Sequence, residues 1–183
     1  MRKIILNLAV SLDGFIEGPN GEYDWCIMEP EMHFDKFLAR VDGAFFGRKS
    51  YELFLTQDPS TFSSDTERNL FAEIAGKEKY IFSNTLAEVN PGSILLKGDI
   101  ATEVNKIKQQ PGKDLWLFGG AQLVSTFIKL NLIDEYQLSV HPIALGAGKP
   151  LFENLADRLK LKHIKTENYP SGVVGLFYEP DRS

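Results

Sequence analysis

The segment 115–152 constrains the fold of this chain more than any other part of its sequence. The apolar run 115–118 ends at Gly119 and Gly120, and a helix-like segment and then a β-rich run, 135–143, follow. This order predicts a strand, a glycine turn, a helix and a strand. Adjacent glycines let the backbone approach a ligand without a Cβ in the way, and a helix that begins at such a turn directs free N–H groups toward it. We expect the turn to bind a phosphate group, namely the pyrophosphate of a dinucleotide.

Length and charge narrow the classes of protein to which the chain can belong. Its 183 residues suit one domain with a substantial core. No apolar run approaches the roughly 20 residues of a membrane span. Asp13 interrupts the apolar N-terminal run, which therefore predicts a first strand and not a signal peptide. The net charge of −5 argues against non-specific binding to nucleic acid. We expect a single domain, 1–183, with no membrane or nucleic-acid partner.

Cysteine and histidine usage points to a reducing compartment and away from metal binding. Cys26 is the one cysteine of the sequence, so an intrachain disulfide is excluded and a cytoplasmic location is expected. The three histidines lie far apart and lack the spacing of metal ligands. We expect no metal site.

Strand-like and helix-like segments alternate through the first 140 residues. The predicted strands are 3–10, 43–46, 79–82, 93–96, 115–118 and 135–143, and the predicted helices include 31–40, 48–55, 64–75 and 99–109. Segments 11–24 and 57–63 are predicted loops, Gly76 is the predicted end of the third helix, and 159–169 with 173–178 form a predicted final hairpin. The alternation predicts an α/β fold with three layers, helix, sheet and helix. Its central sheet is mixed but mostly parallel, and the hairpin adds antiparallel strands at the C-terminus.

The ends of the predicted parallel strands carry the candidate site, because ligands bind such sheets at the carboxyl edge. Gly47 is followed by Arg48, Lys49 and Ser50 at a helix start, a set that offers N–H groups, a hydroxyl and two cations to a phosphate. The alternative is a surface Arg-Lys pair beside a turn. The segment 119–122 is not GxGxxG, so the Rossmann fingerprint is absent. We expect these strand ends to converge.

Carboxylates and aromatic residues between the first two strands are the candidates for substrate chemistry. Glu31 lies where the loop enters a helix, and it either relays a proton or is an acid favoured by the helix dipole. Asp13 either shapes a turn or belongs to the site. Trp25 either covers a pocket or packs in the core. We take Glu31 and Asp13 as candidate catalytic residues, and Trp25 and Phe34 as candidate substrate contacts.

Taken together, these motifs resemble the dihydrofolate-reductase-like superfamily. The resemblance is closer to the reductase domain of riboflavin biosynthesis and its small stand-alone bacterial relatives, and it covers nearly the whole chain. Residues 10–14 (VSLDG) resemble that domain's first-strand signature, and 46–52 (FGRKSYE) resemble the Gly-Arg-x-[Thr/Ser]-x-Glu segment of dihydrofolate reductase. The two glycines with 132–135 and 145–152 resemble the riboflavin-type C-terminal half.

The resemblance implies NADPH as the cofactor, a mobile loop over the nicotinamide at 16–24, and a homodimer. By position, it places 48–50 at the cofactor phosphates, 83–84 at the adenosine 2′-phosphate and 119–122 at the pyrophosphate. The expected cofactor-binding residues are Gly47, Arg48, Lys49, Ser50, Ser83, Asn84, Phe118, Gly119, Gly120, Ala121 and Gln122.

The same resemblance implies a reductase that transfers hydride to a C=N or C=O carbon of a small heterocyclic substrate. The expected activity is most like that of 5-amino-6-(5-phosphoribosylamino)uracil reductase in riboflavin biosynthesis. Dihydrofolate, another small carbonyl or imine, and a non-catalytic nucleotide- or pterin-binding module are the alternatives. The chain departs from the families in its substrate half. The Pro-Trp of dihydrofolate reductase is replaced by Asp24-Trp25, and this sequence contains no zinc-binding Cys-x-x-Cys of a deaminase domain.

Overall fold

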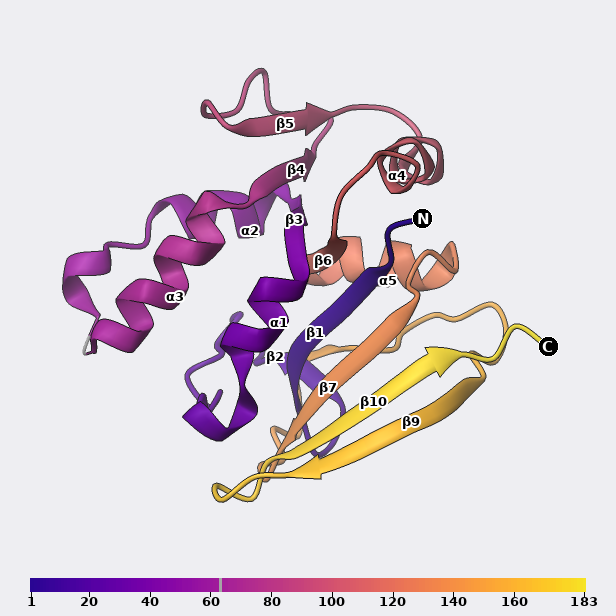
Figure 1. Ribbon diagram of the computed structural model, residues 1–183. Coiled ribbons are helices and arrows are strands. Elements are labelled where there is room, and N and C mark those ends of the chain that lie inside the picture. Colours follow the sequence, from indigo (N-terminus) through magenta and orange to yellow (C-terminus); the bar gives the residue numbers. More distant parts are fainter. Residues whose placement is uncertain (63) are drawn as a thin grey trace.

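The computed structural model describes residues 1–62 and 64–183, and it contains a central sheet of eight strands between two layers of helices (Figure 1). The strands are β1 (Ile4–Ser11), β2 (Phe15–Glu17), β3 (Val41–Gly47), β4 (Glu78–Phe82), β5 (Ser93–Leu96), β6 (Asp114–Gly119), β7 (Glu135–His141), β8 (Lys149–Pro150), β9 (Leu161–Asn168) and β10 (Val174–Pro180). The helices are α1 (Phe34–Arg40), α2 (Arg48–Leu55), α3 (Asp65–Gly76), α4 (Ile100–Lys108) and α5 (Ala121–Lys129), with short 3-10 turns η1 (Pro30–Met32) and η2 (Pro59–Thr61).

The strand order in the central sheet is β5-β4-β3-β6-β1-β7-β10-β9. The first six strands are parallel, and β10 and β9 continue the sheet as an antiparallel hairpin. The predicted mixed, mostly parallel three-layer fold is therefore confirmed. Because β4, β3, β6 and β1 are neighbours and run in one direction, their carboxyl ends meet at one edge of the sheet.

Alternating side chains along the strands build a separate core on each face of the sheet. Ile4 and Leu6 face α4 and α5, whereas Ile5, between them in sequence, faces α1, α2 and α3. Phe45 and Phe46 of β3 divide between the two faces in the same way. This is the period of two that a strand imposes on its side chains. It explains why strands covered on both faces read as continuous apolar runs.

The helix caps predicted from the sequence are present. Ser64 and Glu67 form a capping box at the start of α3, and the carboxylate of Asp99 accepts a hydrogen bond from the Thr102 N–H at the start of α4. The prediction that Gly76 lies beyond the end of α3 was wrong. Gly76 is the last helical residue, and Lys77 follows it in an extended conformation with φ −77°.

Two further predictions need correction. The predicted helix 31–40 is divided into η1 and α1, because His33 between them has a left-handed backbone with φ 49°. The predicted loop 11–24 contains β2, which pairs with β8 in a small antiparallel sheet. Residue 63, the last of the predicted loop 57–63, lies outside the described residues.

Among the described residues, no helix is both long and apolar enough to cross a membrane. The same part of the chain contains no group of three or more His, Cys, Asp or Glu side chains placed to hold a metal ion.

Candidate functional site

The helices α2 and α5 begin side by side at the carboxyl edge of the sheet, and glycines make this contact possible. A Cβ on Gly47, the N-cap of α2, would lie 3.3 Å from the backbone nitrogen of Gly120, the N-cap of α5. A Cβ on Gly120 would lie only 2.7 Å from Ser50 Oγ. Gly119 has φ +131°, which side chains rarely allow, and its peptide bond to Gly120 is cis.

These two helix starts differ from those of α3 and α4. No side chain caps α2 or α5, whereas Ser64 caps α3 and Asp99 caps α4. The first-turn N–H groups of α2 and α5 therefore lack a side-chain acceptor of their own. Two neighbouring helix N-termini of this kind form a favourable environment for an anion.

The other residues predicted to bind the cofactor near these two helix starts differ in exposure and in their contacts. Arg48 Nη1 donates to both carboxylate oxygens of Glu52, at 3.0 and 2.9 Å, so its charge is balanced within α2. Lys49 and Gln122 are exposed. Phe118 is half-buried, and its ring stacks on Phe46 with 4.3 Å between ring centroids.

Ser83 and Asn84 follow β4, the strand next to β3 at the same edge. Ser83 Oγ accepts hydrogen bonds from the N–H groups of Thr85 and Leu86, so it shapes the turn after the strand. The Ser83 N–H donates to the Leu96 carbonyl at 3.3 Å, which places Lys97 beside Ser83 at the end of β5. Lys97 is an exposed cation at this edge that the sequence reasoning missed.

A pocket of about 420 Å³ opens beside the two glycines, between α2, α3, β1 and β2. It is lined by Leu8, Ala9, Ile16, Glu17, Tyr23, Cys26, Ser50, Leu53, Phe54, Gln57, Phe71, Ile74, Phe118, Gly119, Gly120, Ala121 and Val124. Five of the residues predicted from the sequence belong to this wall: Ser50, Phe118, Gly119, Gly120 and Ala121. Its volume and its mostly apolar surface are typical of a small-molecule site.

Glu17 is a pocket residue that the sequence did not single out. It is the last residue of β2, half-buried, and it pairs with Lys149 in the register of the small sheet. Within the described part of the chain its carboxylate has no hydrogen bond or ion pair, since Lys149 Nζ instead contacts Glu153 at 2.5 Å. Glu17 therefore adds to the residues that line the pocket a carboxylate that is not paired with another described residue.

Asp13 lies outside the pocket wall and holds together two loops. Its carboxylate accepts hydrogen bonds from the Ser11 hydroxyl at 2.6 Å, the Gly146 N–H at 2.7 Å and the Leu145 N–H at 3.1 Å. The Ser11 hydroxyl, followed by the Gly146 N–H, lowers the pKa of Asp13 to about 2. Asp13 is thus ionised at neutral pH, which suits a turn anchor better than a proton donor. Its catalytic role stays a prediction.

The other three predicted substrate-side residues are also outside the pocket wall. Glu31 is exposed on η1. The Phe34 ring packs on Trp116 of β6, with 5.6 Å between centroids, in the core beneath α1. The Trp25 ring contacts the ring of His141 edge-on, at 5.4 Å.

Hydrogen bonds attach the loop that carries Trp25 to the central sheet. The buried His141 accepts a hydrogen bond at Nε2 from the Ile27 N–H, at 2.9 Å, while its Nδ1 donates to the Ser139 carbonyl. Glu29 accepts from the Ser171 hydroxyl at 2.7 Å in the β9–β10 turn. Between β2 and these anchors, Tyr23 and Cys26 reach the pocket. Although part of Cys26 is exposed, desolvation of its thiol, followed by the negative charge of Asp24, raises the pKa of the thiol to about 11, so the thiol is protonated and a poor nucleophile.

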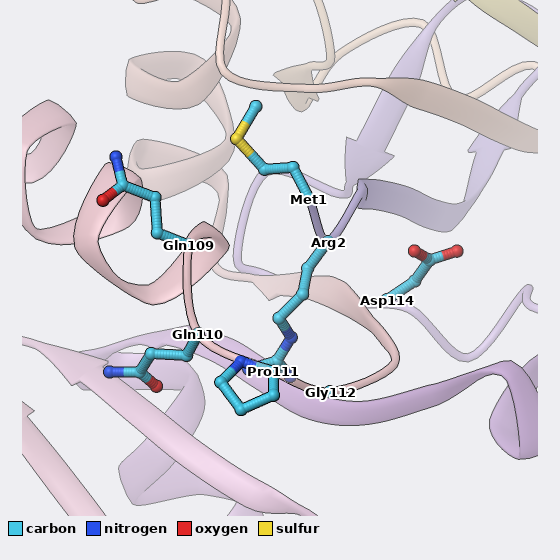
Figure 2. Close-up of a pocket in the computed structure, with 7 residues that line it drawn as sticks. All are labelled: Met1, Arg2, Gln109, Gln110, Pro111, Gly112 and Asp114. Atoms are coloured by element: carbon cyan, nitrogen blue, oxygen red, sulfur yellow. The ribbon is translucent and has the colours of Figure 1, made fainter.

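A second hollow, of about 440 Å³, lies near the N-terminus and away from the strand ends described above (Figure 2). It is lined by Met1, Arg2, Gln109, Gln110, Pro111, Gly112 and Asp114. The Arg2 guanidinium forms an ion pair with Asp42 and donates to the Lys113 carbonyl at 2.6 Å. Because these contacts already use the Arg2 side chain to join chain segments, we assign the hollow no ligand.

Comparisons with known proteins agree with the fold. The sequence matches the family model of the RibD C-terminal domain over residues 2–175. It is 50% identical to the uncharacterized protein YyaP of Bacillus subtilis (strain 168), over 97% of this chain and 94% of that protein. The crystal structure of a putative riboflavin biosynthesis protein from Shewanella sp. PV-4 superimposes with a TM-score of 0.80, at 28% identity and over 100% of both chains.

A more distant structural neighbour comes from Thermotoga maritima. It is a diaminohydroxyphosphoribosylaminopyrimidine deaminase/5-amino-6-(5-phosphoribosylamino)uracil reductase, with a TM-score of 0.70 and 15% identity. The superposition covers 98% of this chain and 56% of that one. At this identity the likeness shows a shared fold.

Proposed function

Because the chain belongs to the RibD C-terminal domain family, we propose that it is an NADPH-dependent reductase of a small planar molecule. The observation that carries this proposal is the contact between the uncapped starts of α2 and α5 beside an apolar pocket. One end of this arrangement suits the pyrophosphate of a dinucleotide, and the other end suits a flat ring. The structural relatives named as reductases support the same class of reaction.

The residues at the sheet edge fit the phosphates of the cofactor. Gly119 and Gly120 leave no Cβ between the backbone and a ligand, and the N–H groups of both helix starts would bind the pyrophosphate. Arg48 would exchange Glu52 for a phosphate, because a bidentate guanidinium contact suits both groups. Lys97 and Ser83 would face the 2′-phosphate at the ends of β5 and β4.

The pocket residues would position the reacting groups and keep water away from them. NADPH, when bound, supplies the hydride, and the acceptor is a C=N or C=O carbon. Phe54, Phe71 and Phe118 offer flat apolar surfaces on which rings stack. The protein therefore contributes mainly orientation, which accounts for much of the rate enhancement when two reactants must meet. The proton comes from a carboxylic acid or from water.

Titration with NADPH, followed by nicotinamide fluorescence, tests the proposal. We expect saturable binding with a Kd of about tens of micromolar or tighter, and weaker binding of NADH, which lacks the 2′-phosphate. Absence of NADPH binding in that range would overturn the proposal. Oxidation of bound NADPH is then sought with a panel of pterins and pyrimidines. Binding without oxidation of any member would instead favour the non-catalytic nucleotide- or pterin-binding module.

A further inference from the structure

The pocket wall carries one charged side chain among its described residues, and that side chain is the carboxylate of Glu17. The other polar side chains of the wall are those of Ser50, Gln57, Tyr23 and Cys26. Tyr23, Cys26 and Leu53 are its exposed members and form the side of the pocket open to solvent.

Three cations of the neighbouring elements have partners of their own, whereas Lys49, beside the wall residue Ser50, is exposed at the rim. Lys149, the register partner of Glu17, contacts Glu153. Lys79 lies over the Phe54 ring, with Nζ 5.6 Å from the centroid, but its ammonium donates to the carbonyls of Ala75 and Lys77 at the C-terminal end of α3. Arg48 pairs with Glu52, and in the proposed complex it would bind a cofactor phosphate. None of these three cations is a member of the pocket wall.

This distribution of charge disfavours an anionic ligand in the pocket. A phosphate ester carries about two negative charges at neutral pH, and it needs cations or N–H groups when it leaves water. Within the pocket it would meet aromatic rings and a second anion, and like charges at close range repel. The N–H groups at the starts of α2 and α5 do not help, because the cofactor pyrophosphate would occupy them.

We propose that the pocket takes a flat, unphosphorylated molecule that is neutral or cationic, and that Glu17 recognises its N–H edge or its positive charge. The proposal deepens the reductase function and rests on it, because the nicotinamide ring would share the pocket. The space left beside that ring suits one or two fused rings. Phe54 and Phe71, stacked on each other with 4.9 Å between centroids, provide an aromatic wall for them. Among its described residues, the pocket wall offers no cation to the phosphate of a phosphoribosyl substrate.

Probes of equal shape and opposite charge test the proposal without knowledge of the natural substrate. Benzamidine, benzamide and benzoate are flat molecules of nearly equal size that are cationic, neutral and anionic. Pyridoxamine and pyridoxamine 5′-phosphate differ by the phosphate alone. Binding of each is measured by calorimetry, with the protein free and saturated with NADPH. Amide chemical-shift changes at Phe54 and Phe71 report whether the probe occupies the pocket.

We expect benzamidine to bind at least about tenfold more tightly than benzoate, because a carboxylate forms a charge-assisted hydrogen bond with one and repels the other. Pyridoxamine should bind more tightly than its phosphate by a similar factor. Glu17→Gln, with Glu17→Ala as a second variant, should reduce both ratios to within about threefold. Glu88→Gln, an exposed carboxylate in the loop before β5, is the matched control and should leave both ratios unchanged.

Equal or tighter binding of benzoate, or of the phosphate, would overturn the proposal, as would ratios that do not change in the Glu17 variants. Failure of every probe to bind at millimolar concentration would overturn it too, because an open aromatic pocket must accept a flat ring. The charge ratios are measured on the free protein as well. A protein that fails to bind NADPH but keeps the ratios therefore contradicts the reductase function and not the selectivity of the pocket.

Discussion

The hydroxyl oxygen of Ser50 occupies the space that a side chain on Gly120 would need, since a Cβ on Gly120 would lie 2.7 Å from Ser50 Oγ. Within the described residues, no other heavy atom beyond the chain neighbours lies within 4 Å of that position. Gly119 differs, because its φ of +131° disfavours any side chain whatever the space around it.

We therefore expect Ser50→Ala to restore the stability that Gly120→Ala loses. It should not restore the stability that Gly119→Ala loses. Gly120→Ala should lower the free energy of unfolding by about 1 kcal/mol through crowding, and the double variant with Ser50→Ala should recover most of it. Gly119→Ala should cost about 1–3 kcal/mol through backbone strain, with or without Ser50→Ala. Urea unfolding of the native protein, the two single glycine variants and the two double variants with Ser50→Ala checks this. Equal rescue of both glycine variants would contradict it.

The ion pair between Arg40 and Glu135 leads to a prediction about stability. Arg40 donates to both Glu135 oxygens, at 2.9 and 2.7 Å, and to Asp114 at 2.8 Å. The Glu135 side chain is 11% exposed, but that of Arg40 is 36% exposed, so solvent weakens the pair. We expect Arg40→Ala to lower the free energy of unfolding at neutral pH by about 2 kcal/mol, because it leaves a buried carboxylate without its cation. Lys162→Ala, whose ion pair with Glu179 is exposed, should cost under about 0.5 kcal/mol.

The ion pair between Arg40 and Glu135 also predicts how the loss of stability in Arg40→Ala depends on pH. Burial raises the pKa of Glu135, but hydrogen bonds from Arg40 and Gln137 outweigh burial, and the net pKa is lowered from the ordinary 4.5. The stabilisation is therefore complete above pH 4.5 and is lost as the pH falls through the lowered pKa. The difference in unfolding free energy between the native protein and Arg40→Ala should be constant above pH 4.5 and should shrink as the pH falls below it. A constant difference would show that packing of the Arg40 side chain, and not its charge, is responsible.

Asp13 gives a prediction about local dynamics. Its carboxylate accepts the N–H groups of Leu145 and Gly146, and Asn at this position would present a donor to one of them. We expect Asp13→Asn to accelerate amide hydrogen exchange at both residues by about tenfold. Asp157→Asn, at an exposed carboxylate, is the control and should not.

The acid range provides a second measurement on Asp13. Because its folded pKa is about 2 and its ordinary value is 3.8, the stability that these hydrogen bonds contribute is complete above pH 3.8 and is lost as the pH falls toward 2. The carboxyl carbon of Asp13 should therefore titrate, by NMR, near pH 2. A midpoint at 3.8 would mean that the two loops are not joined in solution.

Lys97 and Arg48 allow a prediction about cofactor choice. If Lys97 faces the 2′-phosphate, Lys97→Ala should weaken NADPH binding about five- to tenfold and NADH binding much less. Arg48→Ala should also weaken NADPH more than NADH. Lys129→Ala, at the far end of α5, should affect neither. Equal losses for the two cofactors in either variant would place that cation at the pyrophosphate or outside the site.

Local patterns predicted well the helices and strands that meet at the carboxyl edge of the sheet. The helix 48–55 and the strand 93–96 have in the structure the bounds expected from the sequence, because their turns and apolar residues are adjacent along the chain. The convergence of Gly47 and Gly119 followed from one physical fact, that parallel strands end at the same edge. The β4–β5 register that places Lys97 was implicit in the same reasoning but was not used.

The substrate half depends on contacts between distant segments, which local patterns do not specify. β2 is three residues long, too short for a periodic signal, and its partner β8 is far along the chain, so Glu17 gave no sign of its position. The partners of Asp13 at 145 and 146 are similarly remote. Phe34 has the helical spacing of a buried residue, and the structure packs it on Trp116.

The small β2–β8 sheet lies apart from the eight-stranded sheet, yet it supplies the pocket's one charged wall residue among those described. Of its residues, Ile16 alone contacts a hydrophobic core, since it packs, partly buried, against the core on the α4 and α5 face of the large sheet. We expect substitutions there to alter what the pocket accepts at little cost in folding free energy, and to leave the contact between Gly47 and Gly120 unchanged. If the chain is the reductase proposed above, a scaffold divided in this way could acquire new substrates through changes in one short segment.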